Sequence, residues 1–388
     1  MPATPEVVFH RRPNGNTRAE LTLGAECVSW LEVVPFTIRI GLAEVRMDGI
    51  ADVNTLEAHR MKGYSRRVVE ATVERMTQGD AAISMLYGIG NLYHKFGYAT
   101  VGPDHHLVLG LNGNDDLPKG WRVRPFAPDD LPAVRNLYNL AAREATGVAV
   151  RPADHPTWQR IIQPAEALKG NACRVIIGPD GELHAYAWLA EWCYTVFECL
   201  HEGYPDALAI GEVIADSPVS ADGLLAVSRQ WGREQGKRRV ILPVPPDSHV
   251  AISAMYADAR LIRAYEPCGG SMARVLDVRR LLEALRPEIR ARLRDAGSGF
   301  TGRLTIRTDI GDAALLIEPD DVRVEDAEGP DGLVIEMPQT ALVRLALGAF
   351  PPEGILSRLS ETPDARAFEL ASVIFPLRYP HMYPPDRY

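Results

Sequence analysis

Residues 58–65 read AHRMKGYS, and the segments on either side of them have different periodicities. Before them, apolar side chains recur at every second position from residue 45 to residue 53, which is typical of a strand. After them, residues 66–78 carry apolar side chains at the spacing of an amphipathic helix. The octapeptide therefore lies where a strand passes into a helix.

A junction of this kind leaves several backbone N–H groups without a partner at the start of the helix. These donors and the positive end of the helix dipole favour phosphate. Gly63 lets the backbone approach an anion closely, while Arg60 and Lys62 add positive charge. The pattern favours a phosphate-binding turn, and an ordinary turn with surface cations stays open as the alternative.

A second motif follows in residues 88–98, which read GIGNLYHKFGY. Together the two motifs resemble the GNAT acyltransferases, which bind acetyl-CoA. In that family an Arg-x-x-Gly-x-Gly/Ala turn holds the CoA pyrophosphate, and a later Tyr-x-x-Phe-Gly-Tyr/Phe segment supplies a tyrosine that protonates the leaving thiolate. Arg60 and Gly63 match the first motif, with Ser65 in place of the usual Gly or Ala, and residues 93–98 match the second.

By this resemblance Tyr93 is the candidate acid, since a phenol with its ordinary pKa of ~10 is protonated at neutral pH. The alternative is a packing role for Tyr93. Met61 stands where the family often has a second basic residue, and Lys62 or Arg66 would compensate. The resemblance implies acetyl-CoA binding by residues of the strand end, the turn, the helix start and the second motif: Val53, Asn54, Thr55, Arg60, Met61, Lys62, Gly63, Tyr64, Ser65, Arg66, Gly88 and Ile89.

The chain divides into three predicted parts, residues 1–116, 117–277 and 278–388. The second part repeats the GNAT order of strands and helices, but its turn at residues 215–221 lacks the Arg-x-x-Gly motif. Pro218 in that turn removes an N–H that a pyrophosphate would use. We therefore expect the second part to be a degenerate GNAT-like repeat without CoA binding.

Four strand predictions bear on this division. Long strands are expected at residues 27–40 and 43–55, a last strand of the first part at residues 107–111, and a last strand of the second part at residues 272–275. The third part alternates strands with amphipathic helices and resembles the sterol-carrier-protein-2 (SCP2) fold. Both a lipid-binding role and a packing or assembly role stay open for it.

This order of parts resembles the Eis-type (enhanced intracellular survival) N-acetyltransferases, which have an active GNAT domain, a degenerate GNAT domain and a sterol-carrier-like domain. The implied fold class is mixed α/β (α+β). The first GNAT domain is expected to be shortened at its N-terminus, because residue 43 already begins the second long strand. The resemblance also implies a homo-oligomer, namely a hexamer.

Eis-type enzymes use the carboxylate of the chain terminus as the general base, which here belongs to Tyr388. Pro384 and Pro385 stiffen the tail before it. The alternatives are a frayed terminus and one of two other bases, Asp48 or Asp52, which lie on the strand that enters the turn.

Composition limits the classes of protein that fit. Hydrophobic residues make up 46% and charged residues 24%, as in soluble globular proteins. The sequence has no apolar run that spans a bilayer and no apolar leader, so we expect a cytoplasmic protein without a membrane partner. A net charge of −9 argues against nucleic acid and fits a cationic acceptor. Five cysteines without a Cys-x-x-Cys pair, and a histidine pair in a loop (residues 105–106), predict neither a disulfide framework nor a metal site.

The sequence therefore predicts an acetyl-CoA-dependent N-acetyltransferase. Its acceptor is expected to be a primary amine of a small molecule, such as an aminoglycoside, or of a lysine side chain. Tyr93 would act as general acid and the carboxylate of Tyr388 as general base. The alternative from another class is a non-catalytic CoA-binding, lipid-binding or assembly protein with a vestigial GNAT site.

Overall fold

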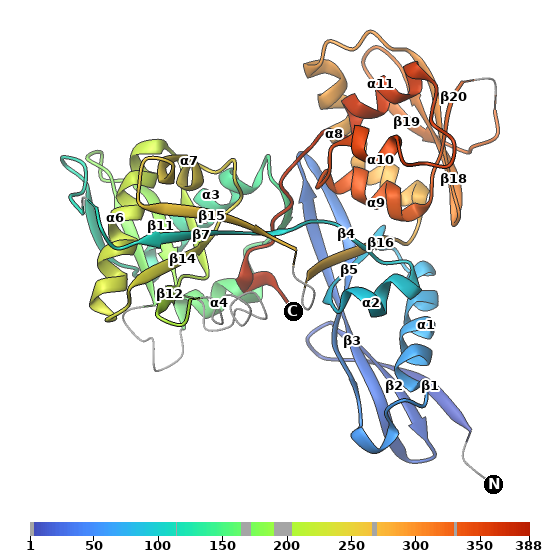
Figure 1. Cartoon of the computed structure of the whole chain (residues 1–388), viewed down its shortest axis with the longest axis horizontal. Helices are drawn as coiled ribbons and strands as arrows, with labels where there is room; N and C mark the ends of the chain where they lie inside the picture. Colours follow the sequence, from blue (N-terminus) through green and yellow to red (C-terminus); the bar gives the residue numbers. More distant parts are fainter. Residues whose placement is uncertain (1–3, 114, 164–171, 190–203, 266–269, 330–331) are drawn as a thin grey trace. The chain divides into compact units, whose positions relative to one another are not determined.

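A computed structural model describes the chain except residues 1–3, 114, 164–171, 190–203, 266–269 and 330–331. The chain divides into two compact units (Figure 1). Unit 1 contains Met1–Gly102, Pro267–Arg378 and Tyr388, and unit 2 contains Pro103–Glu266 and Tyr379–Arg387. The chain therefore changes unit four times: it passes into unit 2 at residue 103, back into unit 1 at residue 267, into unit 2 again at residue 379, and into unit 1 for Tyr388.

Unit 1 is built on a long sheet with the strand order β1-β2-β3-β4-β5-β16-β6. Neighbouring strands are antiparallel except β4 and β5, which are parallel. The two long strands confirm the strands expected at residues 27–40 and 43–55. The bounds are β1 (Pro5–Arg11), β2 (Thr17–Leu23), β3 (Glu26–Ile40), β4 (Ala43–Thr55), β5 (Ile83–Gly88), β16 (Gly270–Val275) and β6 (Ala99–Thr100).

Helix α1 (Tyr64–Thr77) covers one face of this sheet and confirms the helix expected after the turn. Its buried residues Val68 and Val69 share a core with Leu31 of β3 and Ile50 of β4. Short helical turns flank it, namely η1 (Glu57–His59), α2 (Gly90–Tyr93) and η2 (His94–Phe96). Burial of one apolar helix face against the sheet is the main source of stability for such a layer.

Two strands pair differently from the sequence-based expectation. Strand β7 (Asp104–Gly110), expected in the first domain, pairs with β14 (Arg239–Pro243) and β15 (Ala259–Ala264) in unit 2. Strand β16, expected to close the second domain, pairs with β5 and β6 in unit 1. Both are short apolar runs, and the partner of such a strand is set by tertiary contacts that its own sequence does not encode.

The C-terminal region of unit 1 contains a four-stranded sheet with the order β19-β18-β17-β20. The first helix of this region is α8 (Val278–Asp295), and Asp277 caps it by accepting a hydrogen bond from the amide of Arg280. Up to Arg378 this region belongs to the same unit as the first sheet, so the predicted boundary at residue 277 does not separate two units. The elements are α8 (Val278–Asp295), β17 (Gly302–Thr308), β18 (Gly311–Ile317), β19 (Val322–Glu325), β20 (Leu333–Glu336), α9 (Gln339–Leu347), α10 (Pro352–Leu356) and α11 (Ala365–Ile374).

Unit 2 contains two four-stranded sheets, with the orders β13-β11-β10-β8 and β12-β14-β7-β15. Helix α6 (Pro218–Glu234) is buried in a core that includes side chains of β7, β11 and β14. The other elements are β8 (Arg122–Pro125), η3 (Pro128–Asp130), α3 (Leu131–Ala142), β9 (Thr146–Ala149), α4 (Pro156–Ile162), β10 (Cys173–Ile177), β11 (Leu183–Trp188), β12 (Ala207–Ala209), β13 (Glu212–Ala215), α7 (His249–Ala254) and η5 (Pro384–Asp386).

A buried ionic network holds the C-terminal tail in unit 2. Arg151 Nε donates to the two carboxylate oxygens of Asp386 at 2.9 and 3.0 Å, and the same guanidinium pairs with Glu212. The side chains of all three are 0% exposed. Tyr186 Oη donates to Glu212 at 2.6 Å and Thr157 Oγ1 to Asp386 at 3.1 Å. Because each buried charge has charged and polar partners, removing one member leaves the others uncompensated.

None of the helices in the described part of the chain combines the length and the apolar character needed to cross a membrane.

Candidate functional site

The site predicted from the sequence lies where β4 and β5 separate. The two strands pair in parallel from Met47–Ile83 to Ile50–Leu86. Beyond Ile50, β4 continues to Thr55 with pairing to β3, and β5 continues to Gly88 with pairing to β16. In the described residues no β4–β5 pair follows Ile50–Leu86, so one backbone edge of residues 51–55 faces an opening between the strands.

A β-bulge in β4 lies beside this opening. Trp30 and Glu32 of β3 pair with Asn54 and Ala51, so one strand carries an extra residue between the pairs. Asp52 there has a φ of +47°, in the left-handed region that non-glycine residues seldom adopt. Its Oδ2 accepts a hydrogen bond from Trp30 Nε1 at 3.0 Å. These contacts give Asp52 a structural role in the bulge and weaken it as a candidate base.

The start of α1 is open, as the Arg-x-x-Gly motif predicts. Gly63 is the N-cap residue with a φ of +77°, and a Cβ atom there would meet nothing within 4 Å. No side chain in the described part of the chain caps this helix. Arg60 and Lys62 are exposed beside it, and Arg60 Nε donates to the carbonyl of Thr55 at 3.3 Å. The turn therefore presents unfilled N–H donors and positive charge on one exposed surface.

The other predicted cradle residues also lie around this turn. Met61 is completely exposed and has a φ of +63°, so its side chain points away from the protein. Arg66 is exposed on the first turn of α1, whereas Tyr64 and Ser65 are half-buried. The residues from Val53 to Arg66 that the resemblance implied thus lie around one turn, and Arg60, Lys62 and Arg66 are exposed near the helix start.

The corresponding helix start in unit 2 is closed. Helix α6 follows β13, and its N-cap Ser217 accepts a hydrogen bond from the amide of Ser220. Ser220 Oγ accepts in turn from the amide of Ser217 at 3.1 Å. With Pro218 at the first helical position, the donors that an anion would need are filled or missing. This geometry supports the prediction that the second repeat lacks CoA binding.

Tyr93 lies at the end of the short helix that follows β5. Its ring is 6.5 Å from that of Phe96 and 6.2 Å from that of Tyr98, measured between centroids, and it is buried. A Cβ atom at Gly88 would lie 2.4 Å from Cδ1 of Leu86 and 2.5 Å from two carbons of the Tyr93 ring. Gly88, placed among the CoA-binding residues by the resemblance, therefore makes room for the Tyr93 ring, and Ile89 beside it is exposed.

Tyr98 belongs to the core. It is fully buried, and its hydroxyl forms a 2.7 Å hydrogen bond with Ser84 Oγ. Burial raises the pKa of this phenol, so it stays protonated across the physiological range.

The last residue, Tyr388, packs on the opposite face of the same sheet. Ile50 faces the α1 core, so its neighbour Gly49 faces the other side of β4. A Cβ atom at Gly49 would lie 2.3 Å from Cζ of Tyr388. The Tyr388 hydroxyl donates to the carbonyl of Met85 on β5 at 3.1 Å. Tyr93 belongs to the core on the α1 side, so Tyr93 and Tyr388 lie on opposite faces of the sheet, each against β5.

Asp48, the other alternative base, points to the α1 side. It pairs with Ser84 across β4 and β5, and Ser84 Oγ donates to its carbonyl at 2.7 Å. Burial, reinforced by the nearby charge of Asp80, raises the pKa of the Asp48 carboxyl to about 6. Asp48 thus has a pKa suited to proton transfer, but alternation along β4 places it on the face away from Tyr388.

Sequence reasoning missed the residues that surround Tyr388. Gly49 takes one of the alternate positions of β4 that otherwise carry apolar side chains, and an isolated strand glycine often marks a close approach of another group. That signal was present in the sequence. Phe36, Met85 and Tyr87 carry no comparable signal, because aromatic and apolar residues are ordinary in strands.

Metal-ligating side chains do not gather in the described residues: no group of three His, Cys, Asp or Glu there is arranged to hold a metal ion. His105 and His106 lie in β7, not in a loop as the sequence suggested, and both are buried. Burial lowers the pKa of each imidazole to about 4, which keeps both neutral. Cys27 and Cys173 are free thiols, and Cys193, Cys199 and Cys268 lie outside the described residues.

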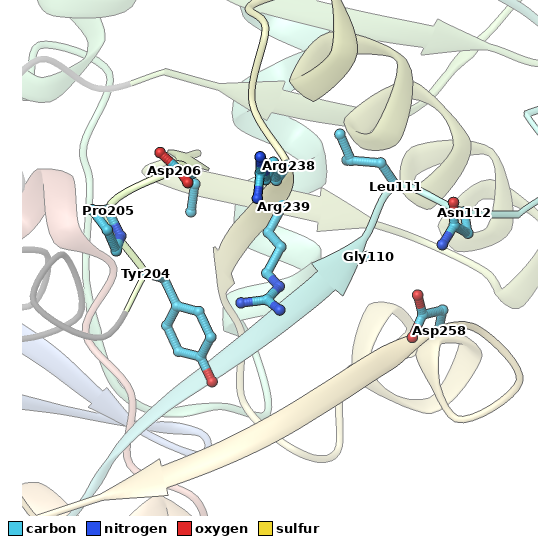
Figure 2. Close-up of a pocket in the computed structure, with 10 residues that line it drawn as sticks. Gly110, Leu111, Asn112, Tyr204, Pro205, Asp206, Arg238, Arg239 and Asp258 are labelled. Atoms are coloured by element: carbon cyan, nitrogen blue, oxygen red, sulfur yellow. The ribbon is translucent and has the colours of Figure 1, made fainter.

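A separate cavity of about 320 Å³ lies in unit 2 (Figure 2). Arg239 extends toward Tyr204, with its guanidinium 5.2 Å from the ring centroid. Asp258 borders the cavity beside Gly110, whose amide donates to the Asp258 carbonyl at 2.7 Å. The cavity shares no residue with the site in unit 1, and its lining carries both positive and negative charge.

Comparison with known proteins agrees with this geometry. Residues 16–101 match the family described as acetyltransferase (GNAT) domain. No curated protein matches the chain significantly. The matched residues 16–101 span β2 to β6 and include the open helix start and Tyr93, so this part of the chain is similar to a GNAT domain, in agreement with the two motifs.

Solved structures extend the likeness to the whole chain. A probable N-acyltransferase of unknown function from Enterococcus faecalis V583 is 12% identical, with a TM-score of 0.74 and 100% of both chains covered. A GCN5-related N-acetyltransferase from Anabaena variabilis is 18% identical, with a TM-score of 0.71 over 96% of this chain and 89% of that one. Eis1 from Mycobacterium abscessus is 15% identical, with a TM-score of 0.62 over 96% and 90%. The predicted mixed α/β architecture with GNAT-like sheets is therefore confirmed, and the SCP2 likeness stays a prediction.

Proposed function

We propose that unit 1 transfers an acetyl group from acetyl-CoA to a primary amine. The observation that carries this proposal is the pairing of an uncapped helix start at Gly63 with the opening between β4 and β5. The first offers N–H donors and cations for a pyrophosphate. The second offers strand edges at residues 51–55, along which an extended pantetheine chain can form hydrogen bonds.

The chemistry requires one proton to be removed and one to be supplied. The amine nitrogen attacks the thioester carbonyl carbon, the carbon–sulfur bond breaks, and the products are an amide and CoA. We assign removal of the amine proton to the carboxylate of Tyr388 and protonation of the departing sulfur to the phenol of Tyr93. In support, these two residues lie on opposite faces of the sheet and both pack against β5.

The acceptor that we propose is a primary amine of a small molecule of the aminoglycoside kind or of a lysine side chain. The net charge of −9 favours a cationic acceptor over an anionic one. We also propose a homo-oligomer, a hexamer by resemblance to Eis-type enzymes, and a cytoplasmic location. Multi-angle light scattering of the purified protein tests the oligomer.

The deciding experiment follows thiol release from acetyl-CoA with polyamines, aminoglycosides and lysine peptides as acceptors. We expect release with at least one of these amines, and none without an acceptor beyond slow hydrolysis. Calorimetric titration with acetyl-CoA runs in parallel. Binding without any transfer would favour a CoA-binding protein with a vestigial site, and absence of both would refute the proposal.

A further inference from the structure

We propose that five residues of unit 1 form a socket for the phenol of the last residue, and that this socket positions the terminal carboxylate for catalysis. The catalytic half of this inference rests on the proposed function, because the position of the carboxylate matters only if it acts as the base. We call these residues the phenol socket: Phe36, Met47, Gly49, Met85 and Tyr87.

Gly49 is required in the socket for space. A Cβ atom at this position would lie 2.3 Å from Cζ, 2.4 Å from Cε2 and 2.7 Å from the hydroxyl oxygen of Tyr388. Gly49 lies inside β4 with ordinary extended pairing to Val34, so its backbone would accept an L residue. Glycine is therefore needed at position 49 because the Tyr388 ring comes close to the backbone, and not because the backbone conformation is unusual.

The polar end of Tyr388 has a specific partner. Its hydroxyl donates to the carbonyl of Met85 at 3.1 Å and lies 3.7 Å from the sulfur of Met47. Burial raises the pKa of this phenol, which keeps it protonated and able to donate. A phenylalanine at position 388 would fill the same ring space but would lose the bond to the carbonyl.

Two aromatic rings complete the socket. The ring of Tyr388 is 5.1 Å from that of Phe36 at an interplanar angle of 33°, and 5.9 Å from that of Tyr87 at 65°. Phe36 pairs with Met47 across β3 and β4, and Tyr87 follows Met85 on β5. Three neighbouring strands thus contribute to the socket, and tilted and edge-on ring pairs of this kind stabilise a buried ring beyond its burial alone.

The position of the socket explains its proposed role. Gly49 and Met85 form one of the last β4–β5 pairs before the strands separate. The terminal carboxylate is attached to the same Cα atom as the ring. Fixing the ring therefore restricts the carboxylate to the neighbourhood of the opening, on the face opposite α1. The chain end is thus held by its own side chain and not left to fray, which is the usual behaviour of a terminus.

The test compares Gly49→Ala, Tyr388→Phe and Tyr388→Ala in the full-length protein. Gly354→Ala is a matched control, because that glycine lies in helix α10 with open space around it. Tyr256→Phe is the second control, because Tyr256 is 90% exposed in unit 2. The first readout needs no activity: it is the rate at which a carboxypeptidase releases residue 388, followed by mass spectrometry.

We expect Gly49→Ala to accelerate this release by at least ~10-fold, since about 1.4 kcal/mol of lost docking already gives that factor. Tyr388→Phe should accelerate it less, because only the hydroxyl bond is lost. In the Tyr388→Ala background the Gly49→Ala change should have no further effect on release, because the ring that it displaces is gone. Equal release rates for Gly49→Ala and Gly354→Ala would overturn the socket.

The second readout is the pH dependence of kcat with acetyl-CoA and the best acceptor. We expect Gly49→Ala to lower kcat at least ~10-fold and shift its acid limb, with KM for acetyl-CoA unchanged. Faster release with an unchanged kcat profile would overturn the positioning role. If the wild type acetylates no amine, the proposed function fails, while the release experiment still decides whether the socket holds Tyr388.

Discussion

The ring of Tyr93 packs directly against the backbone of Gly88, where a Cβ atom would lie 2.5 Å from ring carbons Cδ2 and Cε2. Gly88 is the last residue of β5, and Tyr93 ends the helix that follows it. Leu86 Cδ1 lies 2.4 Å from the same Cβ position. A side chain at position 88 would therefore force both Leu86 and Tyr93 to shift, and would displace the proposed acid from the strand end where it would protonate the thiolate.

The first prediction concerns this contact. Gly88→Ala should lower kcat by roughly 10²-fold, similar to Tyr93→Phe, because both remove a positioned proton donor. The two effects should not add in the double variant, since the displaced group is the same. Steady-state kinetics measure this, with Gly299→Ala as control because a Cβ atom there meets nothing within 4 Å. A fully active Gly88→Ala variant would contradict the role of Tyr93.

The second prediction concerns acetyl-CoA binding at the start of α1. Gly63→Glu places a negative side chain where the pyrophosphate is proposed to bind, so the Kd for acetyl-CoA should rise at least ~10-fold. Gly236→Glu is a matched control, because Gly236 also has a left-handed φ, +64°, and open surroundings. Both variants should lose about 1 kcal/mol of stability from backbone strain. Calorimetry should detect weaker binding only in Gly63→Glu, and equal binding in both would argue against this site.

The third prediction concerns the pH dependence of stability through Asp48. Its pKa is raised to about 6 in the folded protein, above its ordinary value of 3.8, so the folded state holds this proton more tightly than the unfolded chain. The stability that this provides is fully present below pH ~4 and is lost as the pH rises through ~6. Asp48→Asn should therefore be more stable than the wild type at pH 7.5, by about 1–2 kcal/mol after solvent screening.

Urea unfolding between pH 4 and pH 8 measures this difference. The advantage of Asp48→Asn should shrink toward pH 4, because the wild-type carboxyl becomes protonated in the folded state as the pH falls below ~6. Asp320→Asn, at an exposed position, serves as control and should differ from the wild type by no more than ~0.5 kcal/mol. A constant difference at all pH values would show that the pKa of Asp48 is not raised.

The fourth prediction concerns the ionic network of unit 2. Arg151→Met would leave the buried carboxylates of Glu212 and Asp386 without their cation, and should lower the free energy of unfolding by about 3–5 kcal/mol. Arg323→Met removes an exposed pair with Glu318 and should cost no more than ~1 kcal/mol. Thermal and urea unfolding compare the two, and equal losses would mean that the network contributes no more than a surface ion pair.

Much of the candidate site could be predicted because its signals are local. The alternation of residues 45–53, the helical spacing of residues 66–78 and the glycine at position 63 each act within a few residues. The left-handed φ of Gly63 is such a case, because only glycine adopts it without strain. These features led to β4, the turn and α1 as the structure has them.

The exchange of β7 and β16 between the two sheets could not be predicted in the same way. Residues 107–111 and residues 272–275 both have the pattern of short strands, and either could have completed either sheet. The choice depends on hydrogen bonds to strands more than a hundred residues distant, such as those of β16 with β5. Loop entropy and the packing of the whole unit decide which sheet each strand joins. The local propensity of the strand sequence does not determine this choice.

Residue pattern alone was thus enough to predict the turn at Gly63 and the helix after it, because backbone freedom and periodicity are properties of short segments. Tyr93 remains a candidate acid by resemblance to the GNAT motif. The three-dimensional arrangement alone decided which strands close each sheet, that Asp52 stabilises a bulge, and that Gly49 and Met85 receive the ring of Tyr388. Those contacts join residues that are remote in the chain, and their energies exist only once the strands are side by side.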